Sequence, residues 1–206
     1  MKENVILHIQ TEIWAGVSLA IAVCAYVPYL KGIIAGQTRP HAFSWIIWSI
    51  LASVAFGGQL KAGAGGGAWI NGLVALVCAM IAIIALRKNE QIITKGDWAS
   101  FIAACLTIPV WILTGNPLYA IILVTIIDTL AFYPTFRKSW FKPYEESPFA
   151  YILFGLQYLT SVFAMEKINW TTTLYPVWLT FMNALFVVMI SWRQRTQIEI
   201  RAEEKQ

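Results

Sequence analysis

One acidic side chain, Asp128, lies near the middle of the long apolar stretch Leu118–Phe136. Taken as a helix, this stretch is long enough to cross a membrane. An aspartate at the centre of such a helix costs about 2.5–3.5 kcal/mol to insert, and apolar neighbours offset that cost by about 0.3–0.6 kcal/mol each. We therefore expect the carboxyl group to face other helices, on the side shared by Thr125, Thr129 and Phe132.

A carboxyl group at this position offers two kinds of chemistry. Asp128 could bind a polar substrate, or it could take up and release a proton and so couple transport to a proton gradient. Alternatively, it is a structural group that hydrogen-bonds to a threonine, a tyrosine or Gln157 across the bundle. The sequence leaves the functional and the structural interpretation open.

Amide and indole side chains inside other apolar runs are further candidates. Asn71, Gln157 and Asn183 either line a polar cavity or form interhelical hydrogen bonds, each worth about 0.6 kcal/mol on average. Trp45 and Trp48 share one helix face, where anchoring at the membrane interface or packing is favoured over binding a ligand.

Two prolines near the ends of apolar runs have similar surroundings. Pro28 lies in Ala25–Lys31 and Pro134 in Ala131–Lys138. Proline removes a backbone hydrogen bond from a helix, so both positions are candidate hinges or gates.

The composition excludes an ordinary soluble globule. Apolar residues make up 58% and charged residues 13% of the 206 residues, against an average of about 25% charged residues. Runs such as Ile121–Val124 do not alternate as the strands of an outer-membrane barrel would. The isolated Cys24, Cys78 and Cys105 give no metal-ligand or disulfide spacing. We expect an all-α membrane protein with no metal, no cofactor and no nucleic-acid partner.

Apolar windows recur along the chain and predict seven transmembrane helices. Most of the 15 Lys and Arg residues fall in alternate loops, so the positive-inside rule places the N-terminus outside and the C-terminus in the cytoplasm. Residues 1–206 are then a single multi-pass domain of the plasma (cytoplasmic or inner) membrane. The predicted segments are Ile13–Leu30, His41–Gln59, Ala68–Leu86, Trp98–Leu113, Leu118–Phe136, Phe149–Ala164 and Leu174–Trp192.

Regular spacings indicate that the first and last three helices are copies of one unit. Pro28 and Pro134 are 106 residues apart. Trp69 and Trp178 are 109 apart, a drift that small loop insertions would produce. The extra helix between the copies makes them run in the same direction, a known transporter layout with its site at the repeat interface. The expected parts are repeat 1 at about 13–86, the linker helix at about 98–113 and repeat 2 at about 118–192.

This 3+1+3 layout, with a proline near the cytoplasmic end of the first and fifth helices, resembles the SWEET/PQ-loop (SemiSWEET-like) transporter family. The Pro-Gln pair of that family corresponds to Pro28-Tyr29 and Pro134-Thr135 here. Pro176, followed seven residues later by Asn183, matches the family's spacing on its last helix. The resemblance implies alternating access around a midplane site. It favours a cavity role for the substrate-binding candidates, which are Asn71, Asn183, Gln157, Asp128, Ser53 and Ser161.

We therefore expect a transporter or facilitator of a small polar solute, sugar-like or another metabolite, either coupled to protons through Asp128 or uncoupled. The alternative is a receptor or sensor on the same scaffold that does not conduct. No enzyme is expected, because no nucleophile–base pair or cluster of acids appears. The expected partners are the solute and the lipid bilayer, and assembly into a homo-oligomer is left open.

Overall fold

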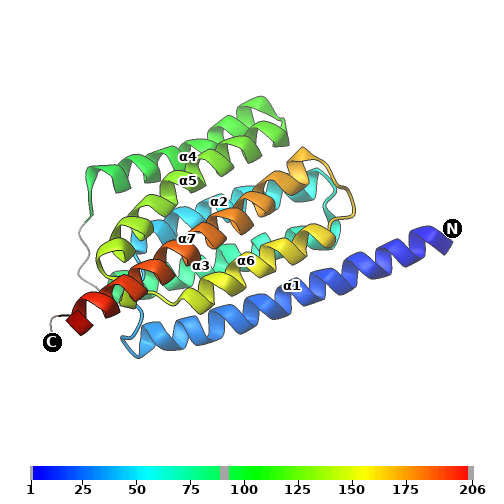
Figure 1. Cartoon of the computed structure of the whole chain (residues 1–206). Helices are drawn as coiled ribbons and strands as arrows, with labels where there is room; N and C mark the ends of the chain where they lie inside the picture. The colour runs from blue at the N-terminus through cyan, green and yellow to red at the C-terminus, as the bar shows by residue number, and fades with distance from the viewer. Residues whose placement is uncertain (1, 89–92, 204–206) are drawn as a thin grey trace.

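The computed structural model describes residues 2–88 and 93–203, and within these ranges every regular element is a helix. Seven α-helices and two short 3-10 helices follow one another along the chain (Figure 1). Their bounds are α1 Lys2–Ile34, α2 Ala42–Lys61, η1 Gly65–Ala68, α3 Trp69–Lys88, α4 Lys95–Thr114, α5 Pro117–Phe141, η2 Pro143–Glu145, α6 Pro148–Phe163 and α7 Trp170–Glu203.

Among the described residues, six helices are long and apolar enough to cross a membrane. They are α1, α2, α3, α4, α5 and α7, whereas α6 is apolar but only 16 residues long. A run of about 20 apolar residues is what a bilayer requires of a spanning helix. The expectation of an all-helical, multi-pass membrane protein is therefore confirmed at the level of helix content, length and composition.

The first and last helices are longer than the apolar runs predicted. α1 has 33 residues and α7 has 34. Neither 2–12 nor 193–203 contains a glycine or a proline, so no helix-breaking residue interrupts these extensions. α4 also begins earlier than predicted. The Thr94 N–H donates to Asp97 Oδ2 (2.7 Å) and the Asp97 N–H donates to Thr94 Oγ1 (3.3 Å), a reciprocal cap.

Short polar sequences start α5 and α6. Before α5, Gly115 has a positive φ of 60° and Asn116 accepts a hydrogen bond from the backbone of the first turn. Before α6, Ser147 accepts a similar bond. Pro117 and Pro148 follow these caps and stand in the first turn, where a helix needs no N–H.

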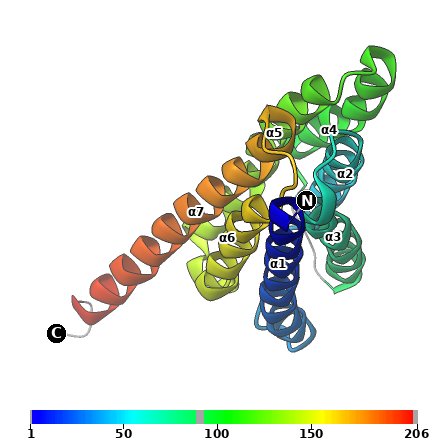
Figure 2. The same cartoon turned by 90° about the vertical axis from the view of Figure 1, so that its right-hand side faces the viewer.

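The helices pack as a bundle with one peripheral member. α2 contacts α3 and α5, while α6 contacts α7 and α1. α1 also contacts α3, and α5 also contacts α7. α4 packs outside these helices, against α5 and α2, on the side of the bundle away from α1 (Figures 1 and 2). Six helices thus surround a common interior.

Candidate functional site

A small cavity lies in the interior of the bundle, between all the α-helices except α4. Its volume is about 40 Å³, which holds a group of a few heavy atoms, since one water needs roughly 10–15 Å³ of such space. The lining side chains are Tyr26 on α1, Trp45 and Trp48 on α2, Val74 and Cys78 on α3, Asp128 and Phe132 on α5, Tyr151, Phe154 and Tyr158 on α6, and Tyr175, Leu179 and Asn183 on α7.

The spacing of these residues explains how each helix reaches the cavity. Lining residues on one helix are three or four positions apart, or a multiple of that spacing, as on α7 at positions 175, 179 and 183. Residues with this spacing share one face of an α-helix. Each helix therefore turns a single stripe toward the interior.

Aromatic rings form most of the cavity wall. Eight of the 13 lining side chains are aromatic. The ring of Trp48 lies 5.2 Å from that of Trp45 and 4.9 Å from that of Phe132, and Tyr26 lies 4.7 Å from Phe154. Inclined pairs of this kind contribute about 0.5–1.5 kcal/mol each beyond the area they bury. The wall is therefore both apolar and stiff.

Asp128 is the acidic member of the wall, and its side chain is 0% exposed. The Tyr175 hydroxyl donates to Asp128 Oδ1 at 3.4 Å, a long hydrogen bond. Asp128 Oδ2 has no hydrogen-bond partner among the described residues. The predicted orientation toward other helices is confirmed. The hydrogen bond from Tyr175 favours the structural interpretation. The oxygen without a partner faces a cavity, where it could bind a ligand or a proton, and this favours the functional interpretation.

Thr129, predicted on the face of Asp128, contacts α7. Its hydroxyl accepts a hydrogen bond from Trp178 Nε1 (3.0 Å). This bond ties α5 to α7 beside the carboxyl group.

Asn183 is the predicted amide that lines the cavity. It is buried, and its Nδ2 donates to the backbone oxygen of Leu179 one turn earlier, at 2.7 Å. Cys78, which was not among the predicted site residues, faces the same cavity from α3. The structure therefore brings Asp128, Asn183 and Cys78 together.

The other two predicted amides are buried beside the cavity rather than in its wall. Gln157 Nε2 donates to the Tyr26 hydroxyl at 3.4 Å, so it supports a lining residue from behind. Asn71 Nδ2 donates to Gln59 Oε1 at 2.8 Å, and Gln59 in turn donates to the backbone of Thr172 at 3.0 Å. These bonds link α3 to α2 and α2 to α7.

The two predicted serines bond within their own helices. The Ser161 hydroxyl is buried and donates to the backbone oxygen of Tyr158 (2.7 Å). Ser53 is exposed on α2, and its hydroxyl donates to the backbone oxygen of Ser49 (2.8 Å). Neither serine lines the cavity.

The candidate hinge prolines lie inside unbroken helices. Pro28 is exposed on α1 and borders a second cavity of about 280 Å³, next to the start of α6. Pro134 is buried in α5. Both lie toward the end of the bundle where α1 and α5 finish.

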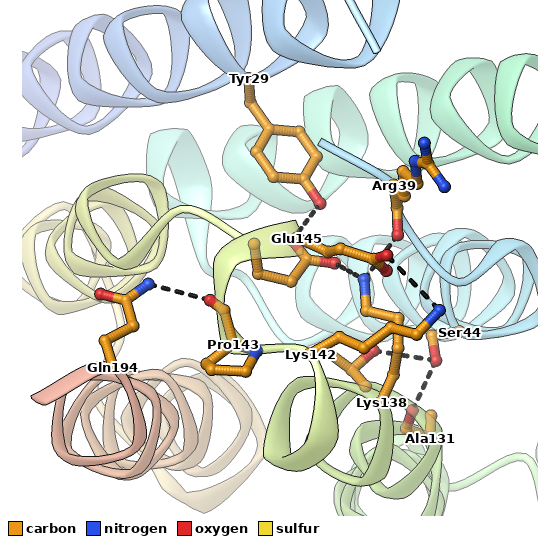
Figure 3. Close-up of polar contacts among 11 residues, drawn as sticks. Tyr29, Arg39, Ser44, Ala131, Lys138, Lys142, Pro143, Glu145 and Gln194 are labelled. Atoms are coloured by element: carbon orange, nitrogen blue, oxygen red, sulfur yellow. Dashed lines mark hydrogen bonds and ion pairs between the residues drawn. The ribbon is translucent and has the colours of Figure 1, made fainter. Parts of the chain in front are cut away.

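That end of the bundle carries a buried acid with several partners, which we call the Glu146 cluster: Tyr29, Arg39, Lys138 and Glu146. The Tyr29 hydroxyl donates to Glu146 Oε2 at 2.9 Å, and Lys138 Nζ pairs with Glu146 Oε1. Lys138 Nζ also donates to the backbone oxygen of Arg39. Tyr29 and Lys138 point from α1 and α5 toward the segment before α6 (Figure 3). The cluster thus joins the end of α1 and the segment after it to the end of α5 and the segment before α6, two parts of the chain about 100 residues apart.

Sequence reasoning missed most of the aromatic wall. Trp45 and Trp48 were expected as anchors or packing residues, yet both are buried and line the cavity. Their spacing of three showed that they share a face. The three-residue spacing of Tyr151 and Phe154 on α6 is the matching signal.

One group of side chains among the described residues has the donors for a metal ion. The ligand atoms of His8, Glu12 and Glu166 lie within 4.8 Å of one another, and all three residues are exposed. The cysteines Cys24, Cys78 and Cys105 are all free.

No family model, curated protein or solved structure matches this chain.

Proposed function

We propose that the protein is a transporter or facilitator of a small polar solute that works by alternating access around the central cavity. One observation carries the proposal: a buried carboxyl oxygen without a partner, on Asp128, in a cavity between six helices. A group that costs free energy when it is buried unpaired is expected at a substrate or ion pathway.

The proposal includes the 3+1+3 layout, with two parallel three-helix units joined by α4. Matching contacts support it. α2 packs on α3 as α6 packs on α7, α1 contacts α3 as α5 contacts α7, and α1 contacts α6 as α5 contacts α2. Exchanging the two units leaves this contact pattern unchanged.

The cavity wall supports the same pairing of helices. Trp45 on α2 and Tyr151 on α6 are 106 residues apart, and Cys78 on α3 and Asn183 on α7 are 105 apart. A site at the interface of two such units is the arrangement found in repeat-built transporters.

Within this scheme, Asp128 is the proton-coupling or substrate-binding group and Asn183 contacts the solute. Gln157 orients Tyr26 through its hydrogen bond. Pro28 and Pro134 let the adjoining ends of α1 and α5 bend, since each removes one helical hydrogen bond. The Glu146 cluster at that end holds the two units together until they rock apart.

In the proposed orientation, the end with the Glu146 cluster faces the cytoplasm, and the N-terminus lies outside. Most loop cations fall on that side, which is the pattern the positive-inside rule associates with the cytoplasm of a plasma membrane protein.

The test is uptake by liposomes that contain the purified full chain. A panel of sugars, amino acids, vitamins and small amines is offered with and without a pH gradient. We expect saturable uptake of one class above protein-free liposomes, and its loss in Asp128→Asn. Thr160→Val, at a half-buried position on α6 that does not line the cavity, is the matched control. Binding of a panel member without any uptake would instead favour the receptor or sensor function.

A further inference from the structure

The cavity wall has an acidic side chain with no basic side chain to balance it among the described lining residues. Among the described residues that line the cavity, Asp128 is the acid, and there is no Lys, Arg or His. A buried carboxylate is strongly disfavoured unless a positive charge or several hydrogen bonds compensate for it. Among the described residues, the hydrogen bond to this carboxyl group is the long one that Tyr175 donates. A cationic ligand would supply what the protein does not.

The remaining wall also suits a positive charge. Eight aromatic rings surround the cavity, including two indoles and four phenols. The faces of such rings carry negative electrostatic potential, so they attract ammonium groups, most strongly where water is excluded. Both tryptophans are buried, at 2% and 8% exposure. This combination of rings and one carboxyl group is the chemistry of a cage for an organic cation.

Other ligand classes fit this wall less well. An anionic solute would meet the Asp128 carboxyl group with no cation among the described lining residues. A polyhydroxylated solute would find hydrogen-bonding groups in the four phenols, the two indoles and the Asn183 amide. It would bring no positive charge, however, to compensate for the buried carboxylate.

We infer that the central cavity binds the positively charged nitrogen of a small organic cation, with Asp128 as its counter-charge and Trp45 and Trp48 among the rings that surround it. This inference rests on the proposed function, in that it names the class of solute taken by the same site. A volume of about 40 Å³ fits an ammonium or a methylated ammonium group. The rest of a larger solute requires the helices to separate.

The experiment measures binding, so that its outcome does not depend on transport. Full-length protein in detergent is titrated by calorimetry with choline and with 3,3-dimethyl-1-butanol, which has the same shape without the charge. We expect choline to bind at least tenfold more tightly. Equal affinities, or binding of glucose in preference to choline, would overturn the inference. Because this comparison uses the unaltered chain, it does not depend on the folding of any variant.

Two variants then locate the charge. Asp128→Asn should weaken choline binding roughly 100-fold, as expected for loss of a buried counter-charge, and should leave the uncharged alcohol unchanged. Trp48→Leu should weaken choline binding roughly tenfold. Trp69→Leu, at an exposed tryptophan on α3, is the matched control and should have no effect. A choline affinity that survives Asp128→Asn would contradict the assigned counter-charge.

A comparison of methylammonium with tetramethylammonium separates the two kinds of cation. Tighter binding of methylammonium would indicate an N–H donated to Asp128 Oδ2, and tighter binding of tetramethylammonium would indicate that the rings and the Asp128 charge hold the cation without a hydrogen bond. Either order supports the inference, whereas binding of neither contradicts it. Choline binding without choline uptake by liposomes would sustain this inference and overturn the transport proposal.

Discussion

Two of the buried acids have contrasting surroundings, one in the cavity and one at the end of the bundle. Glu146 pairs with Lys138 and accepts a hydrogen bond from Tyr29, so both carboxyl oxygens have partners. Asp128 is equally buried but receives one long hydrogen bond, and its second oxygen has none among the described residues. Burial alone therefore does not identify a functional acid. The two acids differ in whether the fold supplies partners for both of their carboxyl oxygens.

The largest effect is expected at Glu146, the acid whose two carboxyl oxygens both have partners. Lys138→Met removes the cation that pairs with Glu146 and leaves a buried carboxylate with the hydrogen bond from Tyr29 but no counter-charge. We expect the free energy of unfolding to fall by about 3–5 kcal/mol, measured by denaturant unfolding in detergent. The matched control is Lys142→Met, which removes a pair between an exposed lysine and the partly buried Glu145 and should cost less than about 1 kcal/mol. Equal losses of unfolding free energy in the two variants would show that the pair with Glu146 stabilises the protein no more than the pair with Glu145.

The second prediction concerns the unsatisfied acid and has the opposite sign. Asp128→Asn replaces an unpaired buried carboxyl group with an amide that can still accept from Tyr175. The free energy of unfolding of the ligand-free protein should rise by about 1–3 kcal/mol, while cation binding and transport fall. A gain in stability with a loss of activity is typical of a functional site. A variant that is less stable than the parent would show that Asp128 is a structural group.

A third prediction separates the two buried asparagines. Asn71→Ala removes an interhelical bond and leaves Gln59 Oε1 without its donor, at a cost of about 1 kcal/mol. Ligand binding by this variant should be unchanged, because Asn71 does not line the cavity. Asn183→Ala is the comparison, since its main effect should be on binding. Calorimetric titration of both variants checks this, and a binding defect in Asn71→Ala alone would reverse the assignment.

The smallest effect is expected at Ser53. Its side chain is exposed, and its hydroxyl bonds to its own helix. Ser53→Ala should change the free energy of unfolding by less than about 0.5 kcal/mol and leave uptake unchanged. Reduced uptake in liposomes would mean that the solute pathway extends beyond the central cavity.

Hydropathy alone could predict the helices and the burial of Asp128. Apolar runs determine where helices form, and the cost of a charge in lipid determines which way Asp128 faces. Hydropathy could not place Trp45 and Trp48. A pair spaced by three defines a face, but the neighbouring helices decide whether that face meets lipid or the interior.

The asparagines show a second limit. Asn71 and Asn183, both predicted to bind the substrate, are 112 residues apart. The lining residues of α3 and α7 are instead related by 105, so Cys78 stands at the position that matches Asn183. Asn71 lies seven residues before Cys78, about 10 Å along the helix. A difference of a few residues in the offset between the repeats amounts to a whole turn of helix or more. The packing of the helices is needed to decide which residues are equivalent.

The unequal lengths of the helices have a practical consequence for following motion. At 33 and 34 residues, α1 and α7 are each about 50 Å long, well beyond a hydrocarbon layer of about 30 Å. The first turns of α1 and the last turns of α7 project from opposite ends of the molecule (Figure 1). A tilt of either helix by about 10° would therefore displace one of its ends by about 9 Å relative to the other. Spin labels on the two tips would convert a slight rocking of the units into a distance change that is easily measured.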